Sequence, residues 1–385
     1  MAPPDIQPLP QLLQLRREFP GLAEGVYLNS AAESLGSTRM AAALQRYAED
    51  KQRGARGREA MYATEAACRE RAARLLGCTP AEIAFCASTT EALNTVLLGI
   101  EWRAGDNLIT SDLEFPSALI AALHVGERYG VEVRVVKHER GVVTPEALAA
   151  RMDDRTRLAL VSHVSFRSGY RIDLEALSDA AHAHGALLLV DAAQSLGAMG
   201  MEAVSAGKVD FLAACTFKWM LGSHGLAVLY CNRERLEAIQ PPAMGWRSVQ
   251  DYFGVVGSLR YDVQPDARRF ETGMLDYGAV YALHEGLGLL EEVGTQAVEQ
   301  RVLALSGRMV NGLKEMGISP LTPEGEAERA GIVAFESPRY DEIGRALQDR
   351  GIYVWTREGR VRAAAHIYNT EEEIDAYCAA LREVC

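Results

Sequence analysis

Between about residue 70 and residue 230, the sequence alternates between short apolar runs of strand length and segments with helical spacing. The strand-like runs are Ala81–Cys86, Asn107–Ile109, Val131–Val136, Leu158–His163, Ala186–Val190 and Gly225–Tyr230. The helical segments are Thr90–Gly99, Pro116–Tyr129 and Leu174–His184. Repeated strand–helix alternation is typical of parallel strands whose connecting helices cover the sheet. We therefore expect an α/β fold with a mainly parallel sheet.

Beyond about Tyr277 the pattern changes to long helical periodicity over Leu283–Met316, interrupted near Gly294. Two strand candidates, Gly331–Phe335 and Arg360–Ala364, and a last helix from Thr370 follow. We expect a large domain at 26–276 and a smaller α+β C-terminal domain at 277–385. The first ten residues include four prolines, so residues 1–25 are expected to form an arm that packs with the small domain.

Composition narrows the class of partner and the cellular location. The net charge of the 385-residue chain is −12, which disfavours nucleic acid and anionic membranes as partners. The seven cysteines show no CxxC spacing, so neither a zinc site nor a disulfide framework is indicated. No apolar run reaches the length that spans a membrane. We expect a cytoplasmic protein with free thiols.

Two polar side chains follow an apolar run at Leu187–Val190, namely Asp191 and Gln194. The carboxyl ends of parallel strands face the ligand crevice of such sheets. An aspartate there can pair with a protonated ring nitrogen, and a glutamine three residues later can reach a neighbouring oxygen. The alternative is an aspartate that caps a turn after a core strand.

Lys218 lies in the mostly apolar segment Asp210–Gly222. Lysine is rarely buried without a partner or a role. Desolvation lowers the pKa of an amine and makes it a nucleophile toward an aldehyde. The alternative is a lysine on a helix face whose amine reaches the solvent.

Three hydroxyl residues, Ser88, Thr89 and Thr90, stand where a strand-like run meets a helical segment. Free backbone N–H groups, the helix dipole and hydroxyl groups together favour a bound phosphate. An ordinary N-cap with Glu91 completing a capping box is the alternative.

In this order and spacing, these features resemble the class V aminotransferase family, in the cysteine-desulfurase-like branch of fold-type I enzymes that use pyridoxal 5′-phosphate (PLP). The resemblance extends from Tyr27–Ala32 to Tyr368–Glu373. It implies that Lys218 holds PLP as a Schiff base and moves protons at the substrate Cα. It implies that Asp191 pairs with the ring nitrogen and that Gln194 binds the phenolic oxygen.

The resemblance also implies the remaining contacts of the cofactor and the substrate. Ser88, Thr89 and Thr90 would bind the phosphate, and Ser165 would also contact the cofactor. Arg362 would bind the substrate carboxylate as a bidentate pair, with Asn29 beside it. The alternative for Arg362 is an arginine on the solvent face of a strand.

Several positions depart from the desulfurase pattern. Phe115 stands where desulfurases stack a histidine on the ring, so we expect proton transfer to depend on Lys218 without a histidine. Cys215 and Phe217 replace a serine and a histidine that contact the phosphate, and Thr216 could supply a hydroxyl instead. Where a partner-subunit threonine usually reaches the phosphate this chain has Met274, and Thr272 could substitute for it.

Further matches are to kynureninase-type and isopenicillin-N-epimerase-type sequences. Ser162–Gly169 contains Arg167, and Gly245–Val249 contains Trp246 and Arg247. The second segment is similar to a loop that enters the neighbouring subunit's site. The resemblance therefore implies a homodimer with its active site at the interface, in which Arg167, Trp246 and Arg247 bind the substrate. Surface positions are the alternative for the two arginines.

Residues 351–360 contain no cysteine, whereas desulfurases carry a reactive one shortly before the substrate arginine. This disfavours a desulfurase, and β-elimination from an S-substituted cysteine by a carbon–sulfur lyase is the leading hypothesis. Transamination, racemisation or epimerisation, kynureninase-like hydrolysis and oxidative decarboxylation or deamination remain alternatives. A non-catalytic scaffold of the same fold is a further one.

Overall fold

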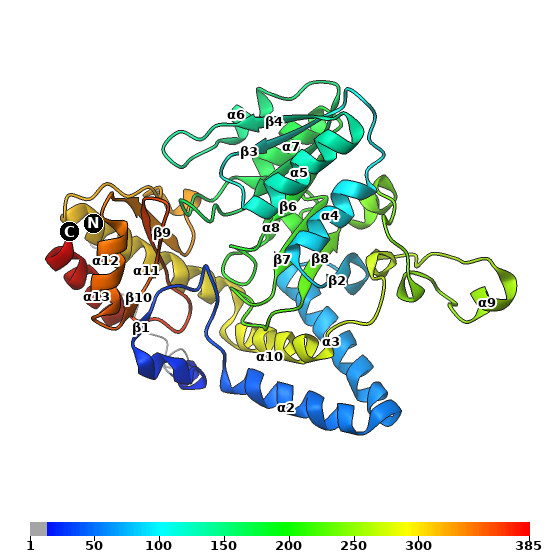
Figure 1. Ribbon diagram of the computed structural model, residues 1–385, viewed down its shortest axis with the longest axis horizontal. Coiled ribbons are helices and arrows are strands. Elements are labelled where there is room, and N and C mark those ends of the chain that lie inside the picture. The colour runs from blue at the N-terminus through cyan, green and yellow to red at the C-terminus, as the bar shows by residue number, and fades with distance from the viewer. Residues whose placement is uncertain (1–13) are drawn as a thin grey trace.

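The computed structural model describes residues 14–385, and a seven-stranded sheet forms the centre of this part of the chain (Figure 1). In spatial order its strands are β2, β8, β7, β6, β5, β3 and β4. Their bounds are β2 Ile83–Cys86, β3 Asn107–Ser111, β4 Glu132–Val136, β5 Thr156–Ser162, β6 Leu187–Asp191, β7 Phe211–Cys215 and β8 Ala227–Cys231. Five neighbouring strands pair in parallel, namely β7, β6, β5, β3 and β4. Strand β8 is antiparallel to both of its neighbours, β7 and β2. The expected α/β fold with a mainly parallel sheet is confirmed.

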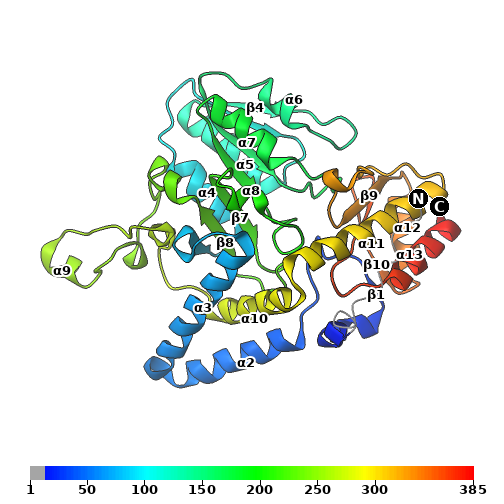
Figure 2. The same cartoon turned by 180° about the vertical axis from the view of Figure 1, so that it is seen from behind.

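Side chains alternate between two apolar clusters on the two faces of this sheet. In β6, Leu188 and Val190 join one cluster, whereas Leu189 joins the other. This alternation follows from the two-residue period of a strand. Helices α4 (Thr89–Gly99) and α5 (Pro116–Tyr129) pack on the face of the sheet that carries Leu189 and contribute side chains to its cluster. The opposite face is covered by α3 (Arg58–Leu76), α7 (Leu174–Ala183) and α10 (Tyr277–Val293), as the view from behind shows (Figure 2).

The C-terminal part of the chain forms a smaller α+β unit. A three-stranded antiparallel sheet has the order β11, β12, β9. The elements of this unit are α11 Thr295–Glu315, β9 Ile332–Glu336, α12 Tyr340–Gln348, β10 Ile352–Tyr353, β11 Trp355–Arg357, β12 Arg360–Ala364 and α13 Glu371–Val384. Gly294, at φ +87°, separates α10 from α11 where the sequence predicts a break.

The start of the described chain lies against this smaller unit. Strand β1 (Val26–Tyr27) pairs in parallel with β10, and Arg16 forms an ion pair with Glu373. Helix α2 (Thr38–Gln52) then packs against α10. The proline-rich first ten residues lie outside the described residues, and the expected domain boundaries stay predictions.

Some elements were not anticipated from the sequence. Strand β7 ends at Cys215, so Lys218 lies in the turn after a strand and not on a helix. Every residue of β7 is buried, which removes the period-two pattern that identifies half-buried strands. The sequence also did not reveal α2, α3, or the short helices α6 (Pro145–Ala149), α8 (Glu202–Ser205) and α9 (Gly254–Ser258). Along residues 14–385, no helix combines the length and apolar character needed to cross a membrane.

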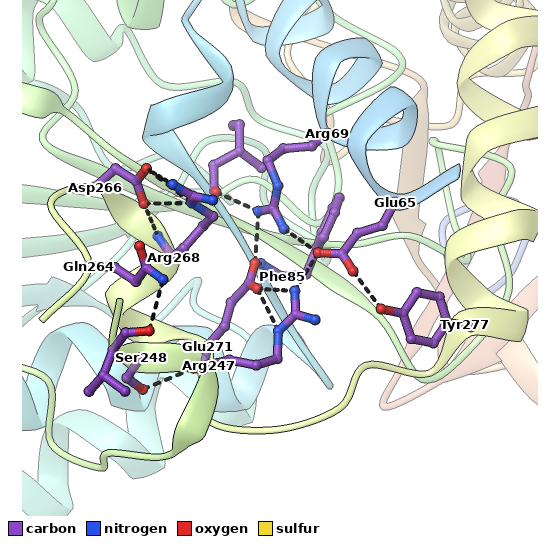
Figure 3. A network of polar contacts seen from close by, with 12 residues as sticks. Glu65, Arg69, Phe85, Arg247, Ser248, Gln264, Asp266, Arg268, Glu271 and Tyr277 are labelled. Atoms are coloured by element: carbon purple, nitrogen blue, oxygen red, sulfur yellow. Dashed lines mark hydrogen bonds and ion pairs between the residues drawn. The ribbon is translucent and has the colours of Figure 1, made fainter. Parts of the chain in front are cut away.

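Residues 241–265 leave the body of the molecule as a projecting arm that carries α9 (Figures 1 and 2). A buried ionic network holds the base of this arm (Figure 3). Arg247 forms ion pairs with Glu65 and Glu271, and Arg69 pairs with the same two carboxylates at 2.9 and 2.7 Å. Tyr277 donates a hydrogen bond of 2.7 Å to Glu65.

This network connects the arm to α3, to α10 and to the sheet, because Glu271 also accepts the backbone N–H of Phe85 in β2 at 3.0 Å. Burial raises the pKa of Glu65, but the charge and hydrogen bond of Arg247 reverse this effect and the pKa falls below its usual value. Two carboxylates and two guanidinium groups balance one another, so removal of one partner would leave a buried charge uncompensated.

Replacement Glu271→Ala should destabilise the protein by about 3–5 kcal/mol, because Arg69 and Arg247 would each lose a buried partner. Urea unfolding monitored by circular dichroism measures this change. The matched control is Glu237→Ala, which removes an exposed carboxylate paired with Arg269 and should cost at most about 1 kcal/mol. Equal effects of the two substitutions would contradict the role given to the buried network.

Candidate active site

A cavity of about 290 Å³ lies where β2, β3, β5, β6 and β7 end. Its wall combines hydroxyl groups, aromatic rings, one carboxylate, one amide and one lysine amine. The residues that line it are Ala87, Ser88, Thr89, Thr90, Phe115, Ser117, Ser162, Val164, Phe166, Asp191, Ala193, Gln194, Cys215, Phe217, Lys218, His224, Gly225 and Leu226. A cavity of about 430 Å³ elsewhere in the described chain, around Arg171, has no lysine in its wall. The smaller cavity is therefore the better candidate.

Asp191 is the last residue of β6 and is 5% exposed. One carboxylate oxygen accepts the N–H of Ala193 at 2.9 Å, the only hydrogen bond to this carboxylate within residues 14–385. Burial raises the pKa of Asp191, while the Ala193 hydrogen bond and the charge of Lys218 oppose the rise. The second oxygen thus remains for a protonated ring nitrogen.

Lys218 presents an amine to the cavity that no carboxylate of residues 14–385 neutralises by an ion pair. Its Nζ lies 5.6 Å from the centre of the Phe115 ring and 5.7 Å from that of Phe217. The two rings shield the amine from water on these sides. This is a suitable environment for an amine that reacts with an aldehyde.

The hydroxyl groups at the start of α4 face the same cavity. Ser88 is the N-cap and accepts the N–H of Glu91 at 3.1 Å. Thr90 donates to Ser117 in α5 at 3.0 Å. The Thr89 hydroxyl is buried and has no hydrogen-bond partner in the described structure. An unsatisfied hydroxyl at a helix N-terminus fits a phosphate oxygen.

Gln194 uses one amide hydrogen to bind the carbonyl of Ala31 at 2.8 Å, and its oxygen accepts the Trp219 indole N–H at 2.9 Å. These two contacts fix the orientation of the amide, and its second N–H is available to an oxygen in the cavity. Together, the carboxylate, amine, amide and hydroxyl groups fit the ring nitrogen, aldehyde, phenolic oxygen and phosphate of PLP.

The structure adds Phe166 and His224 to the site, and sequence reasoning missed both. The 43% exposed ring of Phe115 meets that of Phe166 edge to face at 5.2 Å. The His224 ring stacks on Phe217 at 4.2 Å and lies in the cavity wall, with Nδ1 3.7 Å from a Glu33 carboxylate oxygen. A histidine thus lies at the site, whereas the expectation that Lys218 moves protons without a histidine stays a prediction. The signal was present in the segment Gly222–Gly225, where His224 lies between glycines just after Lys218.

Several residues expected at the cofactor do not line the cavity in this chain. The Thr216 hydroxyl lies 2.7 and 3.0 Å from the carbonyl oxygens of Ser223 and Leu226, which occupy its donor. The Ser165 hydroxyl instead accepts the backbone N–H of Arg167 at 3.2 Å. The backbone of Thr272 lies against Gly245 at the base of the arm.

None of the five residues expected at the substrate lines this cavity, and two of them lie in the projecting arm. Trp246 is 39% exposed and packs edge to face on Tyr252 in the arm. Arg247 is held by Glu65 and Glu271, so this subunit's own cavity does not receive its charge. The expectation that Arg247 binds substrate is not met within one chain.

Arg362 projects from β12 and is 3% exposed, but no carboxylate pairs with it in the described structure. Its Nη1 donates to the Phe166 carbonyl at 2.9 Å, its Nε has no partner, and its guanidinium lies 4.7 Å from the Trp355 ring centre. Burial, together with Arg360, lowers its pKa to about 10. The side-chain oxygen of Asn29, whose backbone pairs with Ala364 of β12, is also buried without a partner. The unpaired guanidinium donors of Arg362 suit a carboxylate ligand, whereas the Asn29 oxygen is an acceptor and would need an N–H or O–H donor.

Comparison with known proteins supports this assignment. The family model described as Aminotransferase class-V matches residues 26–377. The uncharacterized aminotransferase YcbU of Bacillus subtilis is 31% identical, over 94% of this chain and 95% of its own. A probable cysteine desulfurase of Pyrococcus abyssi is 28% identical, over 96% of each chain. A mutant of C-DES with glycine covalently linked to its PLP cofactor superposes with a TM-score of 0.88, at 25% identity over 96% of this chain and 99% of its own.

The names of these relatives contradict the functional expectation drawn from the sequence. That expectation preferred β-elimination and disfavoured a desulfurase because residues 351–360 lack a cysteine. Two relatives that match nearly the whole chain are instead named probable cysteine desulfurases. The missing loop cysteine therefore does not separate this chain from that group.

Replacement Thr89→Val should weaken PLP binding about 10- to 100-fold, because a hydrogen bond to a charged group contributes about 1.5–3 kcal/mol. Titration of the apoprotein with PLP, followed by visible absorbance, measures the change. Thr95→Val is the matched control, since this hydroxyl in the same helix donates to the carbonyl of Glu91. Unchanged affinity in the Thr89 variant would show that the phosphate lies elsewhere.

Proposed function

Because this chain belongs to the class-V aminotransferase family, we propose that it is a PLP-dependent enzyme of the cysteine desulfurase type, which removes the sulfur of an amino acid from Cβ. One observation carries the proposal: a cavity with an unpaired lysine amine and a free strand-end carboxylate lies next to a buried arginine that has no acidic partner. Names of relatives that match nearly the whole chain support the sulfur chemistry.

Each polar side chain at the cavity has a separate task in this proposal. PLP, when bound, draws electrons away from the substrate Cα. Lys218 takes and returns the proton at that carbon, in a position shielded by Phe115 and Phe217. Asp191 keeps the ring nitrogen protonated, and Arg362 holds the substrate carboxylate.

The sulfur needs an acceptor, and the described cavity wall contains one cysteine, Cys215. Burial raises the pKa of its thiol, so little of it exists as the nucleophilic thiolate. We therefore assign the acceptor role to a small thiol from solution. The carbon–sulfur bond of cysteine breaks, the sulfur joins the acceptor thiol as a persulfide, and the freed Cβ takes a proton to give alanine.

The PLP-loaded enzyme should convert L-cysteine and a small thiol into alanine and a persulfide, which excess thiol reduces to sulfide. Mass spectrometry of the amino acid product and a sulfide assay measure the reaction. Lys218→Ala should abolish turnover, whereas Cys215→Ser should retain at least half of it. Pyruvate in place of alanine would contradict the proposal. Loss of turnover in the Cys215 variant would show that the Cys215 thiol, and not a thiol from solution, accepts the sulfur.

We also propose that the projecting arm, residues 241–265, contacts a second copy of the chain in a homodimer. Its apolar side chains have little cover in the single chain, with Phe253, Val256 and Leu259 exposed by 76%, 82% and 86%. Apolar side chains gathered on a projecting element favour an interface with another protein.

A cytoplasmic location belongs to the same proposal, and it is supported by the absence of disulfides among the seven cysteines, all of which lie in the described residues.

Substitution of Val256 and Leu259 together by glutamate should convert the dimer into a monomer of 42.0 kDa, because the charges would be buried at the interface. Sedimentation velocity at micromolar concentration measures the mass. Ser258→Glu adds a charge at a polar position of the same helix and should remain dimeric. A double variant that keeps twice the monomer mass would exclude the arm as the interface.

A further inference from the structure

Two more arginines accompany Arg362 on the side facing the large domain. Arg360 lies two residues earlier in β12, and side chains two residues apart on a strand project from the same face. Arg167 lies in the loop after β5, next to Phe166, whose carbonyl accepts Arg362 Nη1. Besides burial, the charge of Arg167 lowers the pKa of Arg360, and that of Arg360 lowers the pKa of Arg362. Arg167 and Arg360 lie 3.8 and 2.6 Å from the same oxygen of Glu358, and Arg360 and Arg362 share a face of β12, so the three guanidinium groups are neighbours.

The acidic groups around these arginines do not balance them. Glu358 is the one carboxylate of the described chain in ion-pair contact with the three, at 2.6 Å from Arg360 and 3.8 Å from Arg167. It is itself 57% exposed, and Glu336 acts on Arg360 only as a more distant charge. Three cations with one shared, partly solvated acid leave an excess of positive charge.

Unpartnered donors accompany this excess charge. Arg360 and Arg362 are 5% and 3% exposed, and the Nε of each is buried without a hydrogen-bond partner in the described structure. Buried donors without partners are rare because their desolvation is unfavourable. Oxygen atoms of a bound anion would satisfy both groups.

The row formed by Arg362, Arg360 and Arg167 begins at the cavity wall. Phe166 lines the cavity, its carbonyl accepts a hydrogen bond from Arg362 Nη1, and Arg167 is the next residue. A substrate carboxylate on Arg362 would therefore lie beside the Arg360 and Arg167 guanidinium groups. A second acid on the substrate side chain can reach them.

We propose that Arg360 and Arg167 bind a second anionic group of the substrate, a side-chain carboxylate or sulfinate, beside the α-carboxylate on Arg362. This inference rests on the proposed function, because it takes the Lys218 cavity as the amino-acid site. The preferred substrate is then an amino acid whose side chain carries a second acid, before neutral cysteine.

Binding of succinate and butyrate to the PLP-loaded protein tests the inference without turnover. The two anions have four carbons each and differ by one carboxylate. Calorimetric titration should show at least tenfold tighter binding of succinate. Arg360→Gln should remove most of that preference by weakening succinate binding much more than butyrate binding, whereas Arg360→Lys should retain part of it. Arg357→Gln, in the neighbouring strand β11, is the matched control and should behave like the wild type.

Equal binding of succinate and butyrate by the wild type would overturn the proposal. So would an Arg360→Gln variant that binds both anions more weakly by the same factor, because Arg360 would then serve the shared carboxylate or the fold. Failure of cysteine turnover with a persistent succinate preference would instead refute only the desulfurase reaction.

A second variant avoids disturbing a buried side chain. Glu358→Gln removes the exposed acid that shares Arg360 and Arg167, so succinate should bind several-fold tighter while butyrate binding stays the same. Unchanged or weaker succinate binding in this variant would also overturn the proposal.

Discussion

The parallel pairing of β5, β6 and β7 is the constraint on which the site depends. Its register places Ser162 beside Asp191 and Asp191 beside Ala213, so that the ends of three strands meet at one edge of the sheet. Because both faces of the sheet are covered by helices, this edge is where polar groups can remain accessible to a ligand. Lys218 follows β7 by three residues and enters the same space.

Polar groups left unsatisfied by folding gather around this space. The Thr89 hydroxyl, the Asn29 oxygen and the Nε atoms of Arg360 and Arg362 are all buried without partners. Each raises the free energy of the folded protein, and each fits an oxygen or nitrogen of a bound molecule. Binding of cofactor and substrate should therefore stabilise the fold as well as complete the site.

The base of the arm shows the opposite arrangement, because its buried charges are fully paired. Glu65, Arg69, Arg247 and Glu271 neutralise one another and connect the arm to α3 and β2 (Figure 3). An arm fixed in this way can present Phe253, Val256 and Leu259 to a second copy without losing its position. Arg247, which the sequence placed at the substrate, serves this structural purpose within the chain.

The sequence alone determined the α/β class, the parallel sheet and the family, because these depend on periodicity and on the order of Thr89, Asp191, Gln194 and Lys218 along the chain. It could not determine which side chains share a space. Phe166 carries no local signal of a ligand, and His224 shows only its place between glycines just after Lys218. Both reach the cavity because loops after different strands converge. In the sequence, Thr216 and Arg247 both look available to bind a ligand. In the folded chain, Thr216 donates to backbone carbonyls and Arg247 pairs with two carboxylates. The row of Arg167, Arg360 and Arg362 exists only where a loop of the large sheet meets β12, so its excess charge was decided by the tertiary structure.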